Sequence, residues 1–105
     1  MAEIIEQGEV DVTGTVLYTG SLSSVSSTKI LQLKFYNPLA YVLTLERYDA
    51  ATATSKILYS LTLDAGDSVT DSATYALKEG DRLIAYSDIP GTSYYTYGFD
   101  YADSW

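Results

Sequence analysis

Cysteine and histidine are both absent from the 105 residues of this chain. A chain without cysteine can form no disulfide bond and can carry out no thiol chemistry. A chain without histidine lacks the commonest general base and the commonest ligand for metal ions in proteins. The stretch from Gly20 to Ser27 is rich in serine, but a serine nucleophile needs a base beside it. We therefore expect a protein that is not an enzyme and that holds no cofactor or metal ion.

Positive charge is also scarce. Six lysine and arginine residues stand against 14 aspartate and glutamate residues, which gives a net charge of −8. All six bases lie between Lys29 and Arg82, so both ends of the chain are purely acidic. An acidic surface repels nucleic-acid phosphates and anionic lipid headgroups, whereas acidic ends favour docking on a basic partner surface. We expect neither nucleic acid nor a membrane as a partner.

Long apolar runs are missing as well. No run approaches the length that spans a bilayer. Residues 1–6 lack the basic start and the apolar centre of a signal peptide. We therefore expect synthesis in the cytoplasm without a secretory signal.

What the chain does have is short segments in which apolar and polar residues alternate. Apolar residues make up 47% of the chain and charged residues 19%, which is typical of a folded protein. Alternation with a period of two indicates half-buried β-strands. The alternating segments are residues 9–18, 29–36, 41–49, 56–63, 68–75, 82–87 and 93–101. We predict an all-β fold of about seven strands, a small antiparallel β-sandwich that is jelly-roll-like.

This prediction divides the chain into three parts. Residues 1–8 form an acidic N-terminal arm, in which Ile4 and Ile5 are the apolar pair. Residues 9–101 form the single β-sandwich domain, and residues 102–105 form a C-terminal tail. The arm is either a frayed end or a strand that joins the sheet of a neighbouring molecule.

The alternation also predicts which side chains share a face. Residues 29–36 and 41–49 flank a short turn at Asn37 and Pro38, so we expect them to form a hairpin. For residues 9–18 the expected face is Val10, Val12, Gly14, Val16 and Tyr18. For residues 29–36 it is Leu31, Leu33 and Phe35. For residues 56–63 it is Ile57, Tyr59, Leu61 and Leu63.

A short phrase occurs twice in the second half of the chain. Residues 63–69 read LDAGDSV, and residues 77–83, which begin 14 residues later, read LKEGDRL. Glycine at such a corner allows a positive φ, and the aspartate side chain can accept hydrogen bonds from nearby backbone N–H groups. We predict two equivalent corners. The weakly apolar strand between them, residues 68–75, is expected at a sheet edge.

The acidic residues around these corners are the first candidates for chemistry. Glycosidases need two carboxyl groups about 5–10 Å apart across a groove, and calcium sites need several oxygen ligands. At turns, however, aspartate is common for backbone reasons, and the spacing of a calcium-binding loop is absent. We predict structural roles for these residues, which are Asp64, Asp67, Asp71, Glu79 and Asp81.

Tyrosine is unusually frequent, with 11 residues against two phenylalanines and one tryptophan. Tyrosine packs well in strands, is enriched in protein–protein interfaces and can stack on sugars. All three interpretations stay open for the last strand, in which the odd-numbered aromatic residues from Tyr95 to Tyr101 share one face. The residues predicted to contact a partner are Ile4, Ile5, Tyr94, Tyr95, Tyr97, Tyr101 and Trp105.

The middle of the chain resembles the small β-sandwich virion structural proteins of tailed bacteriophages. The resemblance covers residues 29–86, and it rests on FYNP at residues 35–38 and on the two LxxGD corners. It implies a protein that decorates a capsid or occurs in fibres and head–tail accessories, with no catalytic residue. The corner is also similar to jelly-roll strands of trimeric complement- and tumour-necrosis-factor-like domains.

Resemblance and composition together predict a non-enzymatic virion structural protein of a tailed phage. It would decorate or stabilise the capsid through multivalent contacts with the major capsid protein or another virion protein. It would be made in the host cytoplasm and located in the virion, as a homo-oligomer, with a trimer favoured.

The alternative is a carbohydrate-binding β-sandwich module of the fibre or receptor-recognition type. Such a module would expose a flat aromatic row beside Asp100 or Asp103, because sugars stack on rings and bond to carboxylates. Its stacking residues would be Tyr94, Tyr95, Tyr97 and Trp105. A structural protein would instead place the aromatic row in a core or a subunit contact.

Overall fold

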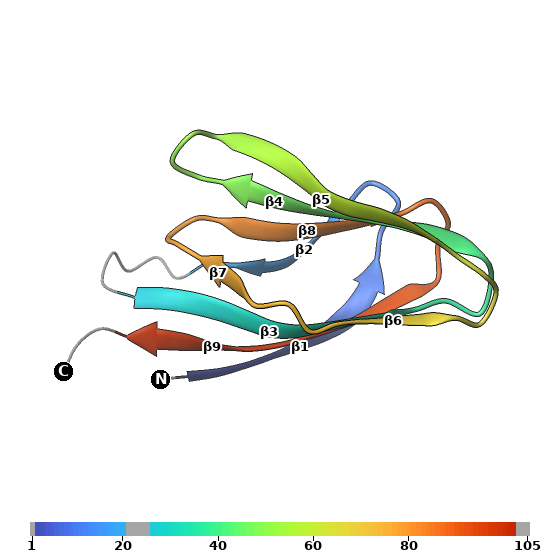
Figure 1. The fold of residues 1–105 in the computed structure, drawn as a ribbon, viewed down its shortest axis with the longest axis horizontal. Coiled ribbons are helices and arrows are strands. Elements are labelled where there is room, and N and C mark those ends of the chain that lie inside the picture. Colours follow the sequence, from blue (N-terminus) through green and yellow to red (C-terminus); the bar gives the residue numbers. More distant parts are fainter. Residues whose placement is uncertain (1, 21–25, 103–105) are drawn as a thin grey trace.

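The computed structural model of the chain describes residues 2–20 and 26–102, which form nine strands in two antiparallel sheets (Figure 1). Sheet A has the order β1-β9-β3-β6, and β7 also pairs with β3. Its strands are β1 (Ala2–Val10), β9 (Thr92–Ala102), β3 (Ser26–Tyr36), β6 (Ser68–Asp71) and β7 (Tyr75–Leu77). Sheet B has the order β2-β8-β4-β5, with β2 (Thr15–Thr19), β8 (Arg82–Ser87), β4 (Tyr41–Asp49) and β5 (Thr54–Leu63). The predicted all-β sandwich is confirmed.

The core lies between the two sheets. Strand β3 contributes Phe35 from sheet A, and strand β4 contributes Leu43 from sheet B, each at most 1% exposed. Fully burying a side chain of this size stabilises the fold by about 1.5–3 kcal/mol relative to leaving it exposed. The buried apolar residues are Ile4, Val10, Leu17, Ile30, Leu33, Phe35, Tyr41, Leu43, Leu45, Leu77, Leu83 and Ala85.

The hairpin predicted for residues 29–36 and 41–49 is wrong, because β3 lies in sheet A and β4 lies in sheet B. The connection between β3 and β4 is held in place by hydrogen bonds of Asn37, which is 1% exposed. Its amide donates to Pro90 O at 3.1 Å and to Thr92 Oγ1 at 2.9 Å, and its own Oδ1 accepts from Leu39 N at 2.9 Å. Buried amide groups need such partners, so the Asn37 corner is held against the start of β9.

The strand predicted for residues 9–18 is two strands with a turn between them. Strand β1 ends at Val10, the turn closes with a hydrogen bond from Gly14 N to Asp11 O at 3.1 Å, and Gly14 has a φ of 105°. A register shift between Val16 and Tyr18 then turns Leu17 into the core, where it is 2% exposed. The face predicted for this segment is therefore wrong, because the chain changes sheets at the turn.

Two further irregularities reverse predicted faces. A bulge between Ile30 and Gln32 in β3 makes Leu31 the additional residue, so Ile30 joins Leu33 and Phe35 in the core. In β5, Leu45 pairs with Tyr59 while Glu46 pairs with Ile57, which leaves Ile57 64% exposed on the outside. A bulge adds one residue to one strand, so every side chain beyond it changes face.

The region of the repeated phrase follows the prediction more closely. Gly66 and Gly80 have φ values of 80° and 82°, so both corners use glycine in the left-handed region as predicted. The strand between the corners is split into β6 and β7, and both pair with β3 at the side of sheet A away from β1. The predicted edge position is confirmed.

The two ends of the described chain lie side by side in sheet A. Strand β1 pairs with β9 along its whole length, from Ala2 opposite Asp100 to Val10 opposite Thr92 (Figure 1). The segment predicted as an arm thus contributes an edge strand to its own sheet. Residues 103–105 of the predicted tail, with Trp105, lie outside the described residues. The division into arm, domain and tail stays a prediction.

Candidate functional site

The residues predicted for partner contact are distributed over both sides of sheet A. Ile4 faces the core and is 5% exposed, and Tyr94 is half-buried and packs against the core. The ring of Tyr94 lies beside Gly8, where an added Cβ atom would be 3.2 Å from Tyr94 Cε1. Burial and the carboxylate of Glu6 raise the pKa of Tyr94. The side chain of Tyr101 and all of Trp105 lie outside the described part of the structure.

The other predicted residues point away from sheet B. Ile5 is 54% exposed, and the rings of Tyr95 and Tyr97 are half-buried on the same side. Tyr97 also meets Phe99 edge to face, with 5.5 Å between ring centroids and 76° between ring planes. We call this outer side of sheet A the aromatic face. It consists of Glu3, Ile5, Gln7 and Glu9 from β1, Ser93, Tyr95, Tyr97 and Phe99 from β9, and Lys29, Gln32, Lys34 and Tyr36 from β3.

Strand pairing arranges the aromatic face in rows that run across the strands. One row is Glu3–Phe99–Lys29, the next is Ile5–Tyr97–Gln32, and a third is Gln7–Tyr95–Lys34. The aromatic residues of β9 therefore form a central line. On its β1 side the charged residues are acidic, and on its β3 side they are basic. The face has an apolar centre between rims of opposite charge.

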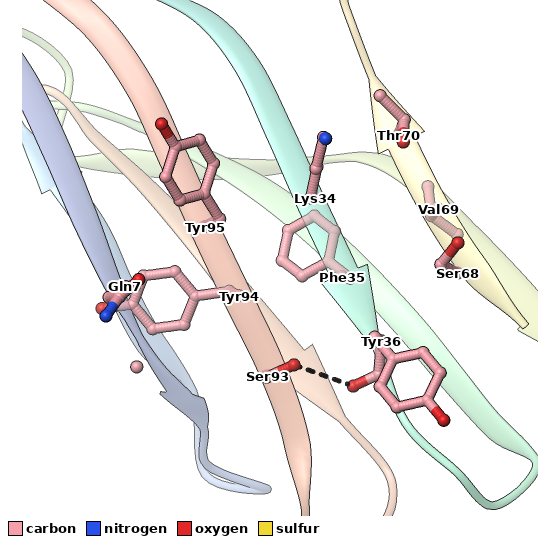
Figure 2. Close-up of a pocket in the computed structure, with 11 residues that line it drawn as sticks. Gln7, Lys34, Phe35, Tyr36, Ser68, Val69, Thr70, Ser93, Tyr94 and Tyr95 are labelled. Carbon is pink, nitrogen blue, oxygen red and sulfur yellow. Dashed lines mark hydrogen bonds between the residues drawn. The ribbon is translucent and has the colours of Figure 1, made fainter. Parts of the chain in front are cut away.

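An open depression crosses one end of the aromatic face (Figure 2). Its volume is about 600 Å³, and its lining includes Gln7, Lys34 and Tyr36. Figure 2 shows Tyr95 and Lys34 projecting side by side from the paired strands β9 and β3. The depression is broad and open, which is a shape that suits the docking of another surface.

Asp100 lies on the opposite side of β9 from the aromatic line. Its carboxylate accepts a hydrogen bond from Tyr18 Oη at 2.8 Å and another from the hydroxyl of Thr28. Burial, this hydrogen bond and the charges of Asp100 and Glu6 raise the pKa of Tyr18 to about 12. Asp100 therefore joins the two sheets inside the protein, and it is not placed to bond a sugar stacked on the aromatic face.

Asp71 makes a second cross-link between the sheets. Tyr59 of sheet B and Tyr75 of sheet A donate to the same oxygen, Oδ2, at 2.6 and 2.7 Å, and Ala73 N donates to Oδ1 at 2.9 Å. Burial raises the pKa of both tyrosines, and the hydrogen bond to Asp71 raises it further. Asp71 thus has the structural role that its position near a turn predicts.

We expect the protein to lose stability as the pH rises above about 10, and Tyr59→Phe to lose less. The folded pKa of Tyr59 lies above the ordinary value of 10.0, so above that pH the unfolded chain releases a proton that the folded protein keeps. The stability that the protonated Tyr59 contributes is therefore fully present below about pH 10, and it is lost as the pH rises further. Urea unfolding of the wild type and of Tyr59→Phe at pH 8 and at pH 11 checks this prediction. If both proteins lost the same free energy of unfolding between the two pH values, the prediction would be wrong.

Of the remaining corner residues, Asp81 has a carboxylate with a structural role. Asp81 is buried and accepts hydrogen bonds from Arg47 Nη2 at 2.6 Å, Ala50 N at 2.9 Å and Lys78 N at 3.0 Å. Asp64 and Asp67 are exposed on one turn, which the bond from Asp67 N to Asp64 O closes at 3.1 Å. Among residues 2–20 and 26–102, no cluster of three acidic, histidine or cysteine residues could hold a metal ion. The same residues include no helix that is long and apolar enough to cross a membrane.

A second surface was not predicted from the sequence. Strand β5 is an edge of sheet B, because among the strands of residues 2–20 and 26–102 it pairs with β4 alone. It exposes 64% of Ile57, 40% of Leu58 and 37% of Leu61, and its one charged residue is Lys56. Native edge strands are usually protected by charges, proline or shortness, so an apolar edge of this length favours pairing with another chain.

The sequence signal that could have predicted this edge was the lack of glycine, proline and acidic residues in residues 54–63. The bulge concealed it, because a regular alternation would have turned Ile57 inward.

Comparison with known proteins finds similarity in fold alone. No protein-family model matches the chain, and no curated protein matches it. The fold is similar to a chain from the Bacillus endospore appendages, described as a novel family of disulfide-linked pili, with a TM-score of 0.54 and 12% identity. The match covers 97% of this chain and 86% of that one.

Two viral structures are similar at a lower level. One is a pentameric capsid protein isolated from metagenomic phage sequences, with a TM-score of 0.46, 19% identity, and coverage of 96% of this chain and 60% of that one. The other is from infectious bursal disease virus, Gx strain, with a TM-score of 0.38, 10% identity, and coverage of 94% and 28%. TM-scores this low support no conclusion about this chain, whereas the pilus chain supports its fold.

Proposed function

We propose that this protein is a non-enzymatic virion structural protein that decorates or stabilises a capsid through many copies of a modest protein–protein contact. The proposal rests on the resemblance of residues 29–86 to such proteins and on the surfaces of the fold. Its partners are further copies of itself and the major capsid protein or another virion protein. The trimer favoured by the sequence stays a prediction.

The aromatic face is the observation that carries this proposal. Tyrosine and phenylalanine are enriched in the centres of protein interfaces, and charged residues are confined to their rims. Here Tyr95, Tyr97 and Phe99 form the centre, with glutamates on one side and lysines on the other. A folded chain gains nothing by leaving such a line half exposed, so we infer that a partner covers it.

The fold itself is compatible with assembly. The similar pilus chain belongs to appendages described as disulfide-linked. The present chain contains no cysteine, so its own assembly must depend on noncovalent surfaces. It has two of these on different sheets, the aromatic face on sheet A and the β5 edge on sheet B (Figure 1). Two contact surfaces on one copy permit the multivalent attachment that a particle component needs.

The sugar-binding alternative has less support from the geometry. The aromatic row is only half exposed, and Asp100, which that alternative would place beside a sugar, points into the protein and bonds to Tyr18. Asp103 lies outside the described residues. Sugar binding is therefore kept only as an experimental result that would replace the proposal.

We expect the purified protein to self-associate and the combined Tyr95→Thr and Tyr97→Thr substitution to weaken that association about 30-fold or more. Central aromatic residues of interfaces contribute about 2 kcal/mol or more when truncated, which is a factor of about 30 in affinity. Threonine keeps the β-propensity of the strand, so the fold should survive. Sedimentation velocity over a wide dilution series measures the association.

Tyr48→Thr is the matched control, because Tyr48 lies on the outside of sheet B beside Arg82, at 5.2 Å from the guanidinium carbon to the ring centroid. It should leave the association unchanged. A wild-type protein that stays monomeric at every concentration would remove the self-assembly claim. If that monomer bound a glycan array and the double variant did not, the sugar-binding alternative would replace the proposal.

A further inference from the structure

We propose that two copies of this chain pack their aromatic faces together around a two-fold axis that runs parallel to β9. This inference rests on the proposed function, and it names the partner and the orientation for that contact. The partner is a second copy because the face carries its own complement. Its acids lie on β1 and its bases lie on β3, on opposite sides of one aromatic line.

Two orientations would place the face symmetrically on itself with the strands of the two copies aligned, as packed sheets commonly are. If the two-fold axis ran across the strands, β1 of one copy would lie over β1 of the other. With the axis at the Tyr97 row, Lys29 would then face Lys34 of the second copy. Like charges placed opposite each other oppose association. This orientation is therefore disfavoured.

A two-fold axis parallel to β9 instead brings opposite charges together. It places β1 of one copy over β3 of the other, so Glu3 faces Lys29 in the row that contains Phe99. Tyr97 and the other residues of the central line then face their own counterparts across the axis. Because a two-fold contact is isologous, each favourable charge pair occurs twice. Charge thus selects one of the two orientations.

The size of the face predicts a weak dimer. From Ser93 to Phe99 the strand rises by roughly 20 Å, and the three strands of the aromatic face span roughly 10 Å. Such a patch is smaller than the roughly 800 Å² per partner of a standard stable interface. We therefore expect association that depends on concentration, which suits a component whose contacts act together in an assembly.

The test is a charge-reversal cycle measured by sedimentation velocity. Glu3→Lys alone and Lys29→Glu alone should each weaken dimerisation by about tenfold or more, because each change sets two pairs of like charges against each other. The two substitutions combined should restore the affinity to within about threefold of the wild type. Asp64→Lys and Lys78→Glu are matched controls, since both are exposed loop positions outside the aromatic face and outside β5, and they alter the net charge equally.

A second measurement is independent of charge. Since the chain has no cysteine, Ser93→Cys introduces a single thiol on the central line, which the axis would bring near its counterpart. Facing sheets lie about 10 Å apart, beyond the roughly 7 Å limit for a direct disulfide, so a short bismaleimide is the suitable reagent. Ser93→Cys should give a covalent dimer, and the control Ala65→Cys, in the exposed turn between β5 and β6, should not.

The outcomes separate this inference from the proposed function. Association that persists through both single reversals, without restoration in the double variant, would overturn the two-fold contact and leave self-assembly intact. A solution mass equal to three copies would also overturn the two-fold contact and leave self-assembly intact. A monomer at every concentration would overturn both. Weakening by each reversal, recovery in the double variant and crosslinking at residue 93 would establish the contact.

Discussion

Replacing Asp81 by alanine should lower the free energy of unfolding by about 3 kcal/mol. The carboxylate is 3% exposed and forms an ion pair with Arg47 at 2.6 Å. Removal of one partner from a buried pair costs about 3–5 kcal/mol, and we expect the lower end because Arg47 is 29% exposed and can be hydrated. The substitution also removes the acceptor for the backbone N–H groups of Ala50 and Lys78. Urea unfolding at pH 7 measures the loss.

Asp67→Ala is the matched control, because Asp67 holds the same place in the first copy of the repeated phrase. Its side chain is exposed, and the turn is closed by its backbone N–H group. We expect a loss below about 1 kcal/mol, as for other surface substitutions. Equal losses at the two corners would show that the aspartates act through the turn and not through the buried ion pair.

The effect of Asp81→Ala should also depend on pH. Burial of the Asp81 carboxyl opposes ionisation, but hydrogen bonds from Ala50 N and Lys78 N and the charge of Arg47 outweigh it and hold the pKa below the ordinary value of 3.8. A lowered folded pKa gives stability that is present above the unfolded pKa and is lost as the pH falls through the folded one. The difference between wild type and Asp81→Ala should therefore shrink below about pH 4.

Replacing Gly98 by alanine should destabilise the protein by about 3 kcal/mol. Gly98 lies in the middle of β9, between Ile4 of β1 and Ile30 of β3. An added Cβ atom would overlap the carbonyl oxygen of Lys29 and lie 2.9 Å from Ile30 Cα. Both are backbone atoms next to the bulge of β3, so relief requires that the two strands move apart. Overpacking of this kind costs about 1–3 kcal/mol, and we expect the upper end because no side chain can rotate away.

Gly8→Ala is the control for this second prediction. A Cβ atom at Gly8 would be 3.2 Å from Cε1 of the Tyr94 ring. A ring at the end of a side chain can shift by a few tenths of an ångström, so we expect a change below about 1 kcal/mol. Thermal or urea unfolding compares the two variants. If Gly98→Ala were as stable as Gly8→Ala, the close approach of β9 to β3 would have to relax more easily than the structure indicates.

Part of the candidate site was predictable because the alternation along one strand is a local property. Side chains in a strand point to opposite faces in turn. For β9 this alone separates Tyr95, Tyr97 and Phe99 from Tyr94, and the structure has them on opposite sides. The corners at Gly66 and Gly80 were predictable for the same reason, since positive φ and aspartate bonding involve only neighbouring residues.

The rows of the aromatic face were not predictable, because they join residues far apart in the chain. Glu3, Lys29 and Phe99 share a row only because β9 lies between β1 and β3. Strand order depends on which sheets pack together, and no local pattern records it. The same limit explains the wrong hairpin at Asn37, where buried hydrogen bonds to Pro90 and Thr92 direct the chain into the other sheet.

Composition and local periodicity were therefore sufficient for the all-β class, the Gly-Asp corners and the two sides of the last strand. The tertiary structure alone decided the sheet to which each strand belongs, the three register shifts and the neighbours of each charge. The physical reason is the distance along the chain over which each effect acts. Turn preferences and side-chain alternation act over a few residues, whereas a bulge or a strand order is selected by the packing of the whole core. The acidic and basic rims of the aromatic face, and hence its fit to a second copy, belong to that second group.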